Sequence, residues 1–512
     1  MASRPATIQH RIAVLPALGW LWLAVLVVLG VLGFPVRRHH FEAAGIAFGA
    51  AMCFYVALPP SGVRSRLPAW RFPSWRVVVA PTVAAVCAFF WAINLGPLSD
   101  DFVLRQWAMA GDWAGVDWDY FRPLPLALWW IVLAVGEWPA LHALNVAIHA
   151  INSGLVALIV GGWYGVRAAT VSGLVFALLP TSTEAVVWAA GVFDLTSTFF
   201  ALLAVVMWVG MRGSALRTVA LSACCVAALL AKESAIALLP LFAVLSAFAC
   251  ARNGRDVGRQ SRVWVSVIAA TVLVLFWRAL WAPNVIEHIA AFPQDRRALK
   301  DLVLRPYAAL VAPVSTNVGP AIEAHLLGLI AVVLLFVALI CTLPFRRASP
   351  GHRFGEAGVV VSLAWVASAA LPLLGTLEVS ADLQGGRYLY LAAVGWALFC
   401  GVSVVAPTKL SRWVLVALVV LATLYVGAIH ERRGAWREAA RLRDDLLLQA
   451  RAFVSANRCR TLQISNAPDS VAGAFVFRTG LAEALSAMPY ATEGHDCVAT
   501  WSDGRLVPSP VP

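Results

Sequence analysis

The residues best suited to chemistry in this chain are charged side chains placed beside long apolar runs. Lys232 stands next to Glu233 in "LLAKESAIALLP", where it either neutralises that glutamate at a tight turn or binds a phosphate as a point charge. Arg387 follows two glycines in "LQGGRYLYLAAVGW", which allow a tight turn that exposes the guanidinium to phosphate. Arg278, in "VLFWRALW", is a weaker phosphate ligand, because a long side chain there simply reaches the membrane surface.

Two adjacent aspartates, Asp100 and Asp101 in "NLGPLSDDFVLRQW", directly follow a stretch suited to lipid. Neighbouring carboxylates repel each other, and charge is costly beside a bilayer. If 99–107 is helical with Ser99 as its N-cap, the two side chains point about 100° apart and cannot serve one ligand equally. The alternative is a pair of acids in the first helical turn, where the helix dipole favours them.

A polar stripe follows on the next apolar segment. His142, Asn145, His149 and Asn152 recur at helical spacing and share one face. The two histidines are about 10.5 Å apart along a helix, too far to bind one metal ion. The stripe is predicted to form interhelical hydrogen bonds or a polar wall beneath an active site.

Glu184 and Asp194 lie where two spans meet the outer surface, in "LPTSTEAVVWAAGVFDLTST". The plainest interpretation is helix capping, with Thr183 capping a short helix that has an early glutamate and Asp194 capping the next helix.

The elements that position these residues are membrane helices. The chain has 512 residues, of which 61% are hydrophobic and 13% charged, and its mean hydropathy is +0.79. Soluble domains are far more charged. The sequence predicts an all-α polytopic membrane protein with about thirteen spans, since apolar runs of about 17 or more residues, long enough to cross a bilayer, recur along most of the chain and several shorter runs accompany them. The spans lie near 12–34, 42–60, 77–95, 138–161, 168–181, 194–211, 217–231, 234–251, 263–282, 326–344, 357–375, 388–406 and 413–430.

Charge asymmetry sets the orientation. With the N-terminus inside, the short inner loops are rich in arginine and hold only two acidic residues, Asp256 and Glu356. The basic residues are spread over these loops rather than gathered on one face, which argues against nucleic-acid binding. The long external loops are then 96–137, 181–194, 283–325 and 376–387. The first of these contains a segment, 123–136, that is too short to span and is predicted to lie on the outer membrane surface.

Six motifs in order resemble the GT-C membrane glycosyltransferases, in particular bacterial relatives of the O-mannosyltransferases that carry tetratricopeptide repeats. They are "DD", "YFRPL", "HALNVAIHAIN", "LLPTSTEAVVWAAGVFDLTS", "LLAKESA" and "GGRYLYL", within residues 94–395. The chain departs from that family in two N-terminal spans that precede the usual first span and in lacking a repeat array, which puts a protein acceptor in doubt.

The resemblance implies transfer of a hexosyl or mannosyl group from a polyprenyl-phosphate-linked donor to an acceptor hydroxyl, with inversion. The acceptor would be a protein or an envelope glycan. One of Asp100 and Asp101 would be the general base, and the other would hold an arginine or a divalent cation; no other cofactor is implied. Donor-phosphate ligands would be Arg122, Lys232, Arg278 and Arg387, and the sugar or acceptor pocket would include Tyr120, His142, His149, Glu184 and Asp194.

Three parts are predicted along the chain: two additional spans in 1–76, a GT-C-like catalytic domain in 77–430, and a small periplasmic domain in 431–512. Cys459 and Cys497 both lie in that last part, where an oxidising compartment would let them pair. The protein is expected in the bacterial inner membrane, surrounded by lipid and with its active site facing the periplasm.

The main alternative is a transporter or flippase for a lipid-linked envelope glycan, which would also carry polar helical faces. Transporters usually place charges near the bilayer midplane and show internal repeats. Here the ionisable residues gather at the outer ends of spans, which favours an enzyme. A non-catalytic scaffold would tolerate the aspartates as solvated caps.

Overall fold

The chain's structure is a computed structural model that describes residues 70–111, 122–210, 215–242, 244–245, 257–281, 309–310, 354–370, 379–380, 382–405, 411–486, 488–490 and 494–509. The predicted spans 12–34, 42–60 and 326–344 lie outside these residues, and so does Tyr120.

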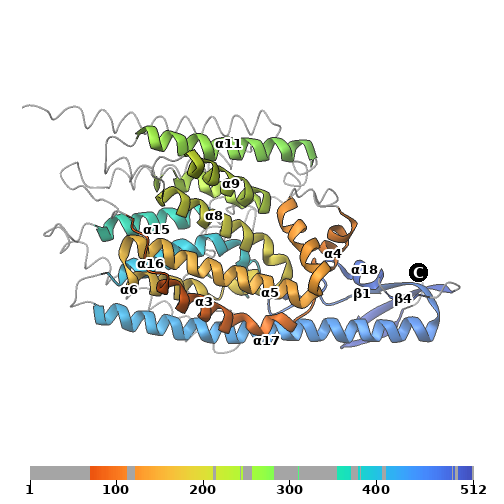
Figure 1. Ribbon diagram of the computed structural model, residues 1–512. Coiled ribbons are helices and arrows are strands. Elements are labelled where there is room, and N and C mark those ends of the chain that lie inside the picture. The colour runs from red at the N-terminus through yellow and green to blue at the C-terminus, as the bar shows by residue number, and fades with distance from the viewer. Residues whose placement is uncertain are drawn as a thin grey trace, which may run out of the picture.

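The membrane part is a bundle of helices, along which α17 runs and then continues toward a small set of strands (Figure 1). Its elements are α3 (Arg76–Phe89), η1 (Phe90–Asn94), α4 (Asp101–Ala110), α5 (Pro123–Tyr164), α6 (Val166–Ala177), α7 (Ser182–Val187), η3 (Ala189–Gly191), α8 (Val192–Gly210), α9 (Ala215–Ala231), η4 (Glu233–Ala237), α11 (Val257–Trp281), α15 (Phe354–Ala370), η8 (Gly386–Leu389), α16 (Tyr390–Ser403) and α17 (Ser411–Asn457).

Four helical segments in the described ranges are long and apolar enough to cross a membrane, namely Arg76–Asn94, Pro123–Tyr164, Ala189–Gly210 and Val414–Asn457. Shorter apolar helices accompany them. The chain is therefore an integral membrane protein, and the total of thirteen spans stays a prediction.

The bundle has a central and a peripheral layer. In the apolar stretches of α5 and α8, 67% of residues are buried inside the protein, against 28% for α3. Val83 on α3 and Val419 on α17 are exposed, as expected of side chains that face lipid. Small residues let the central helices approach closely, since a Cβ added at Gly401 of α16 would lie 1.9 Å from Ser172 Oγ on α6.

The long helix α5 contains a break. Gly136 and Glu137 leave helical geometry just before Pro139, whose ring nitrogen has no N–H to donate. The helix before the break corresponds to the surface helix predicted over 123–136, and the helix after it to the span predicted from 138.

The N-cap of helix α4 lies one residue later than predicted. Ser99 adopts a left-handed backbone with φ of 50° and is not the N-cap, which is Asp100 instead. Neither side chain caps the helix by a hydrogen bond. The Ser99 hydroxyl bonds to Asp100 and lies within hydrogen-bond distance of the Thr479 hydroxyl instead. The two aspartates therefore sit at the cap and at the first helical position.

The all-α prediction is wrong for the C-terminal part. Strands β1 (Cys459–Ser465), β4 (His495–Ser502) and β5 (Arg505–Pro508) form one sheet, with β1 parallel to β4. A hairpin of β2 (Ser470–Val471) and β3 (Ala474–Phe475) and the short helix α18 (Leu481–Ser486) accompany the sheet. Along β1, buried Cys459 and Leu462 are separated by two exposed residues at an irregularity in the pairing, so the strand lacks the regular alternation that would mark it in the sequence. The boundary drawn at 430 lies within α17, which joins the two parts without interruption.

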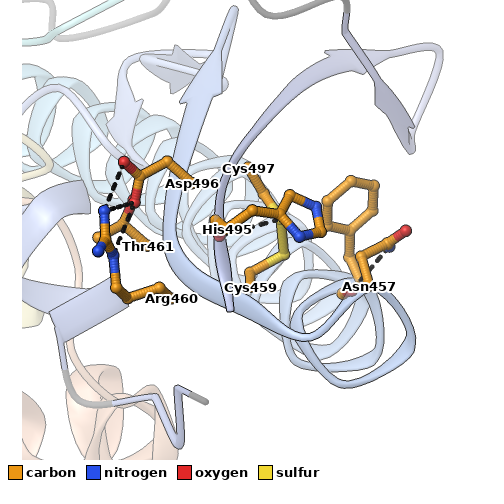
Figure 2. The surroundings of a disulfide bond; sticks show 8 residues. Asn457, Cys459, Arg460, Thr461, His495, Asp496 and Cys497 are labelled. Carbon is orange, nitrogen blue, oxygen red and sulfur yellow. Dashed lines mark hydrogen bonds and ion pairs between the residues drawn. A yellow bond between two sulfur atoms is a disulfide. The ribbon is translucent and has the colours of Figure 1, made fainter. Parts of the chain in front are cut away.

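A disulfide staples this sheet. Cys459 opens β1 and Cys497 lies on the adjacent β4, with Cα atoms 5.6 Å apart, and the two sulfur atoms are bonded (Figure 2). Beside the bond, Arg460 and Thr461 donate to the Asp496 carboxylate across the same two strands.

Replacing both cysteines, C459S/C497S, should loosen the sheet without opening the bundle. The bond closes a loop with a sequence separation of 38, which corresponds to roughly 2–4 kcal/mol of stabilisation. Limited proteolysis of the full chain in detergent should show new cleavage within 459–509. The matched control, C87S on α3, should be cleaved like the wild type, and identical cleavage of all three proteins would contradict the prediction.

Candidate active site

Asp101 is a fully buried carboxylate with both oxygens occupied. Leu98 N donates to its Oδ2 at 2.8 Å, and Ala190 N donates to its Oδ1 at 2.9 Å. Burial raises the pKa of Asp101 well above its usual range, and the two backbone N–H groups oppose that shift. A raised pKa suits a base, but a base must first reach the proton it takes. Asp101 has no exposed surface and instead joins the loop before α4 to η3.

Asp100 is partly exposed and points elsewhere. Its Oδ1 accepts hydrogen bonds from Ser99 Oγ, at 3.2 Å, and from Thr479 Oγ1. Within the described part of the chain, only this oxygen of Asp100 accepts a hydrogen bond. The two adjacent aspartates therefore differ in access. Asp101 is buried with both oxygens bonded, whereas Asp100 is partly exposed and has one oxygen without a described partner.

The C-terminal part holds the backbone that carries Asp100. Ser99 N donates to Val476 O at 2.9 Å, and Thr479 N donates to Ser99 Oγ at 3.3 Å. Gly480 has φ of 78°, and a Cβ there would lie 2.3 Å from Ser99 O, so only glycine permits this approach. The stacked rings of Phe102 and Phe477 cover the contact.

Glu184 and Arg387 form a buried ion pair. Arg387 Nη1 lies 2.9 Å from Glu184 Oε1, and Gly385 N donates to Glu184 Oε2 at 2.7 Å. Gly385 is left-handed, with φ of 85°, as the predicted tight turn requires. The Arg387 guanidinium lies over the rings of Trp188 and Tyr388, at 4.4 and 4.8 Å from their centroids.

Asp194 and Lys232 form a second buried pair, with Lys232 Nζ 2.5 Å from Asp194 Oδ1 and both side chains less than a tenth exposed. Asp194 is thus the third residue of α8 and not its cap. Lys232 lies over the same Tyr388 ring, 5.0 Å from its centroid, so the two pairs share one aromatic surface.

A third pair joins Arg122 to Glu233, with Arg122 Nε 3.0 Å from Glu233 Oε2. The pairs belong to one charged cluster, because Arg122 and Arg387 both act electrostatically on Lys232. Asp100 acts in the same way on Arg387. Residues from four separate predicted motifs therefore meet beside the open aspartate.

The polar stripe of α5 supports these segments from below. His142 Nε2 donates to Gly96 O at 3.1 Å, and Asn145 Nδ2 donates to Trp188 O at 2.8 Å. His149 Nε2 donates to Ala177 O at 3.1 Å, so its Nδ1 accepts from Tyr390 Oη at 2.7 Å in the neutral ring. The stripe is buried and engaged with neighbouring segments of the protein.

The divalent cation considered for Asp100 or Asp101 lacks a ligand set in these residues. Both oxygens of Asp101 are occupied, and among described side chains no three His, Cys, Asp or Glu residues lie close enough to hold a metal ion. Arg278 lies on α11, and its side chain is outside what the structure describes.

Several site residues escaped the sequence analysis. Arg443 is buried on α17 and donates to Leu95 O at 3.0 Å and to Pro97 O at 2.6 Å, bracing the segment that leads to Asp100. Arg432 donates to Asp382 O at 2.6 Å and so braces the segment that leads to Arg387. The sequence did contain a sign of these two arginines. The stretch "HERRGAWREAARLRDD" places several arginines just after the last predicted span, on the side where the positive-inside rule predicts few of them. No comparable pattern in the sequence marks Thr479.

Comparison with known proteins identifies the fold alone. No family model matches the chain, and no curated protein matches it. Among solved structures, it is similar to ArnT from Cupriavidus metallidurans bound to undecaprenyl phosphate, with 14% identity and a TM-score of 0.51, over 77% of this chain and 83% of that chain. ArnT in the apo state matches with 16% identity and a TM-score of 0.37, over 75% and 82%. The first likeness supports the predicted GT-C type fold.

Replacing one partner of the Asp194–Lys232 pair should lower the free energy of unfolding more than replacing both partners. Either D194L or K232M leaves a buried charge without its partner, which costs about 3–5 kcal/mol, whereas D194L/K232M should recover most of that loss. Thermal unfolding in detergent measures the difference. D496N, which breaks an exposed pair on the sheet, is the control and should change little. A double variant no more stable than either single one would contradict the prediction.

The contact between Ser99 and Thr479 can be tested by a designed disulfide. Their hydroxyl oxygens are 3.2 Å apart, so S99C/T479C should crosslink readily on mild oxidation of the folded protein. Each single cysteine variant, treated in the same way, controls for reaction with native cysteines. The crosslink is detected as a peptide pair by mass spectrometry, and its absence would place the C-terminal part away from Asp100.

Proposed function

We propose that this protein is a glycosyltransferase. It would move a sugar from a polyprenyl-phosphate-linked donor to an acceptor hydroxyl at the outer face of the membrane, with Asp100 as the general base. The observation that carries the proposal is a cluster of three ion-paired cations, together with the partly exposed carboxylate of Asp100, which acts electrostatically on one of them, Arg387. The fold is similar to that of ArnT, which was crystallised with undecaprenyl phosphate.

The general base in this proposal is Asp100. An acceptor oxygen attacks the anomeric carbon, the bond from that carbon to the donor phosphate breaks, and the acceptor proton moves to the carboxylate. The hydroxyls of Ser99 and Thr479 hold Oδ1, so the carboxylate is oriented before the acceptor arrives. Asp101, with no exposed surface, is assigned the supporting role.

The leaving phosphate carries the charge that must be stabilised. Lys232 and Arg387 are each held by a carboxylate and an aromatic ring, and each keeps further N–H donors for a ligand. Arg122 lies beside them and is assigned the same role, while Glu184 and Asp194 orient the cations. Buried pairs of this kind position charge in advance, so the phosphate binds with little rearrangement.

The disulfide supports a periplasmic position for the site, since such bonds persist in oxidising compartments. We assign the protein to the bacterial inner membrane on that basis and on the charge asymmetry of its loops. A mannosyl-type donor and a protein or envelope-glycan acceptor are the substrate classes that the O-mannosyltransferase resemblance favours.

The test separates the two aspartates. A deletion strain is complemented with wild-type protein, D100N or D101N, and its envelope glycans and glycoproteins are compared by mass spectrometry. D100N should reach wild-type abundance and lower one sugar modification by about 10²-fold or more, because the base is lost. D101N should instead lower the amount of folded protein, because an amide cannot accept at both oxygens from Leu98 and Ala190.

D503N, at an exposed turn of the sheet, is the control and should retain both abundance and modification. Full modification with D100N would refute the assignment of the base. If deletion alters the envelope while D100N behaves as wild type, the transporter or scaffold explanation is the better one.

A further inference from the structure

A cavity of about 710 Å³ opens between the end of α3 and the extended helix α17. On α17, Arg433, Arg437 and Arg441 recur one turn apart on one face, and Arg443 and Asp444 complete that wall. The opposite wall comes from η1 and the residues around it. The side chains there include Phe90, Trp91, Asn94 and Leu95. None of the residues assigned above to the donor site lines this cavity.

The cavity holds more positive charge than its carboxylate can balance. Asp444 pairs with Arg443, and Arg441 pairs with Glu438 and Asp445 outside the cavity. Arg433 and Arg437 make no ion pair with any residue that the structure describes.

Instead, both guanidiniums lie near one ring, that of Trp91, at 5.7 and 5.9 Å from its centroid. The Nε atom of Arg433 is buried and has no hydrogen-bond partner among the described residues. Two like charges beside one ring repel each other, and an anion between them would offset that repulsion.

The position of the cavity identifies the source of that anion. Phe90 and Val426 are 64% and 55% exposed, and they mark the outer end of the lipid-facing surfaces of α3 and α17. Arg433 lies seven residues beyond Val426, about 10 Å along the helix, which places the arginines in the headgroup layer. Trp91 is the residue type that anchors at this level.

We propose that this cavity binds the phosphate group of a membrane lipid headgroup through Arg433 and Arg437. A phosphate can accept hydrogen bonds from both guanidiniums at once. The Trp91 ring would hold the two guanidiniums at the depth of the lipid headgroups. Arg443 lines the same cavity and braces Leu95 and Pro97, so a bound lipid would also steady the segment that leads to Asp100. The site is separate from sugar transfer and does not depend on it.

Native mass spectrometry of the purified full chain tests this binding without any transfer assay. The probes are dioleoyl phosphatidylglycerol, dioleoyl phosphatidylcholine and inorganic phosphate. Phosphatidylglycerol should bind to wild type at one site that R433Q/R437Q binds about tenfold or more weakly, since charge-assisted hydrogen bonds are lost. R451Q, which changes an exposed arginine on the same helix that does not line this cavity, should bind like the wild type. If R433Q/R437Q is not monodisperse, R437Q replaces it.

Equal phosphatidylglycerol binding by wild type, R433Q/R437Q and R451Q would overturn the proposal. A loss confined to inorganic phosphate, with phosphatidylglycerol unchanged, would overturn the lipid assignment and identify a free-phosphate site. Weaker binding of phosphatidylglycerol that phosphatidylcholine does not share supports an anionic headgroup. None of these outcomes depends on whether D100N loses the sugar modification, so the two proposals fail separately.

Discussion

A carboxylate enclosed by an apolar bundle needs donors for both of its oxygens, and Asp101 finds them on two different segments. One donor, Leu98 N, belongs to its own loop, and the other, Ala190 N, belongs to the turn between α7 and α8. That single side chain therefore sets the distance between the loop before α4 and η3. Asp100 is exposed at a defined place because its neighbour is buried.

The same constraint explains the ion pairs. A cation in a low-dielectric environment is costly unless a carboxylate accompanies it, and Lys232 and Arg387 each have one. Their shared ring, Tyr388, keeps the two cations beside each other and excludes water from one side. The resulting cluster is preorganised, with its positive groups oriented by Asp194 and Glu184. If the cluster binds a donor phosphate, as proposed, such preorganisation would let it bind with little reorganisation of the protein.

Helix α17 connects membrane and sheet in one rigid element. Its apolar half faces lipid, and its arginine-rich half extends beyond the membrane, where Arg443 and Arg432 brace the two segments that carry Asp100 and Arg387. After the first strand of the sheet at its end, the chain runs back toward the bundle, where Thr479 donates a hydrogen bond to Asp100. The C-terminal part therefore contacts the loop that carries Asp100 directly, through Thr479 and Val476.

Sequence alone determined the membrane class, the break before Pro139 and the gathering of charge at the ends of spans, because hydropathy, proline geometry and charge cost act locally. Through a resemblance of motifs it also predicted that one of Asp100 and Asp101 shares a site with Glu184 and Arg387, and that site stays a prediction. Tertiary structure decided which aspartate is open and which carboxylate holds each cation, since Glu184 and Arg387 are 203 residues apart. It also decided that Thr479 contacts Ser99, at a separation of 380. Contacts at such separations depend on how helices pack, and no local pattern encodes them.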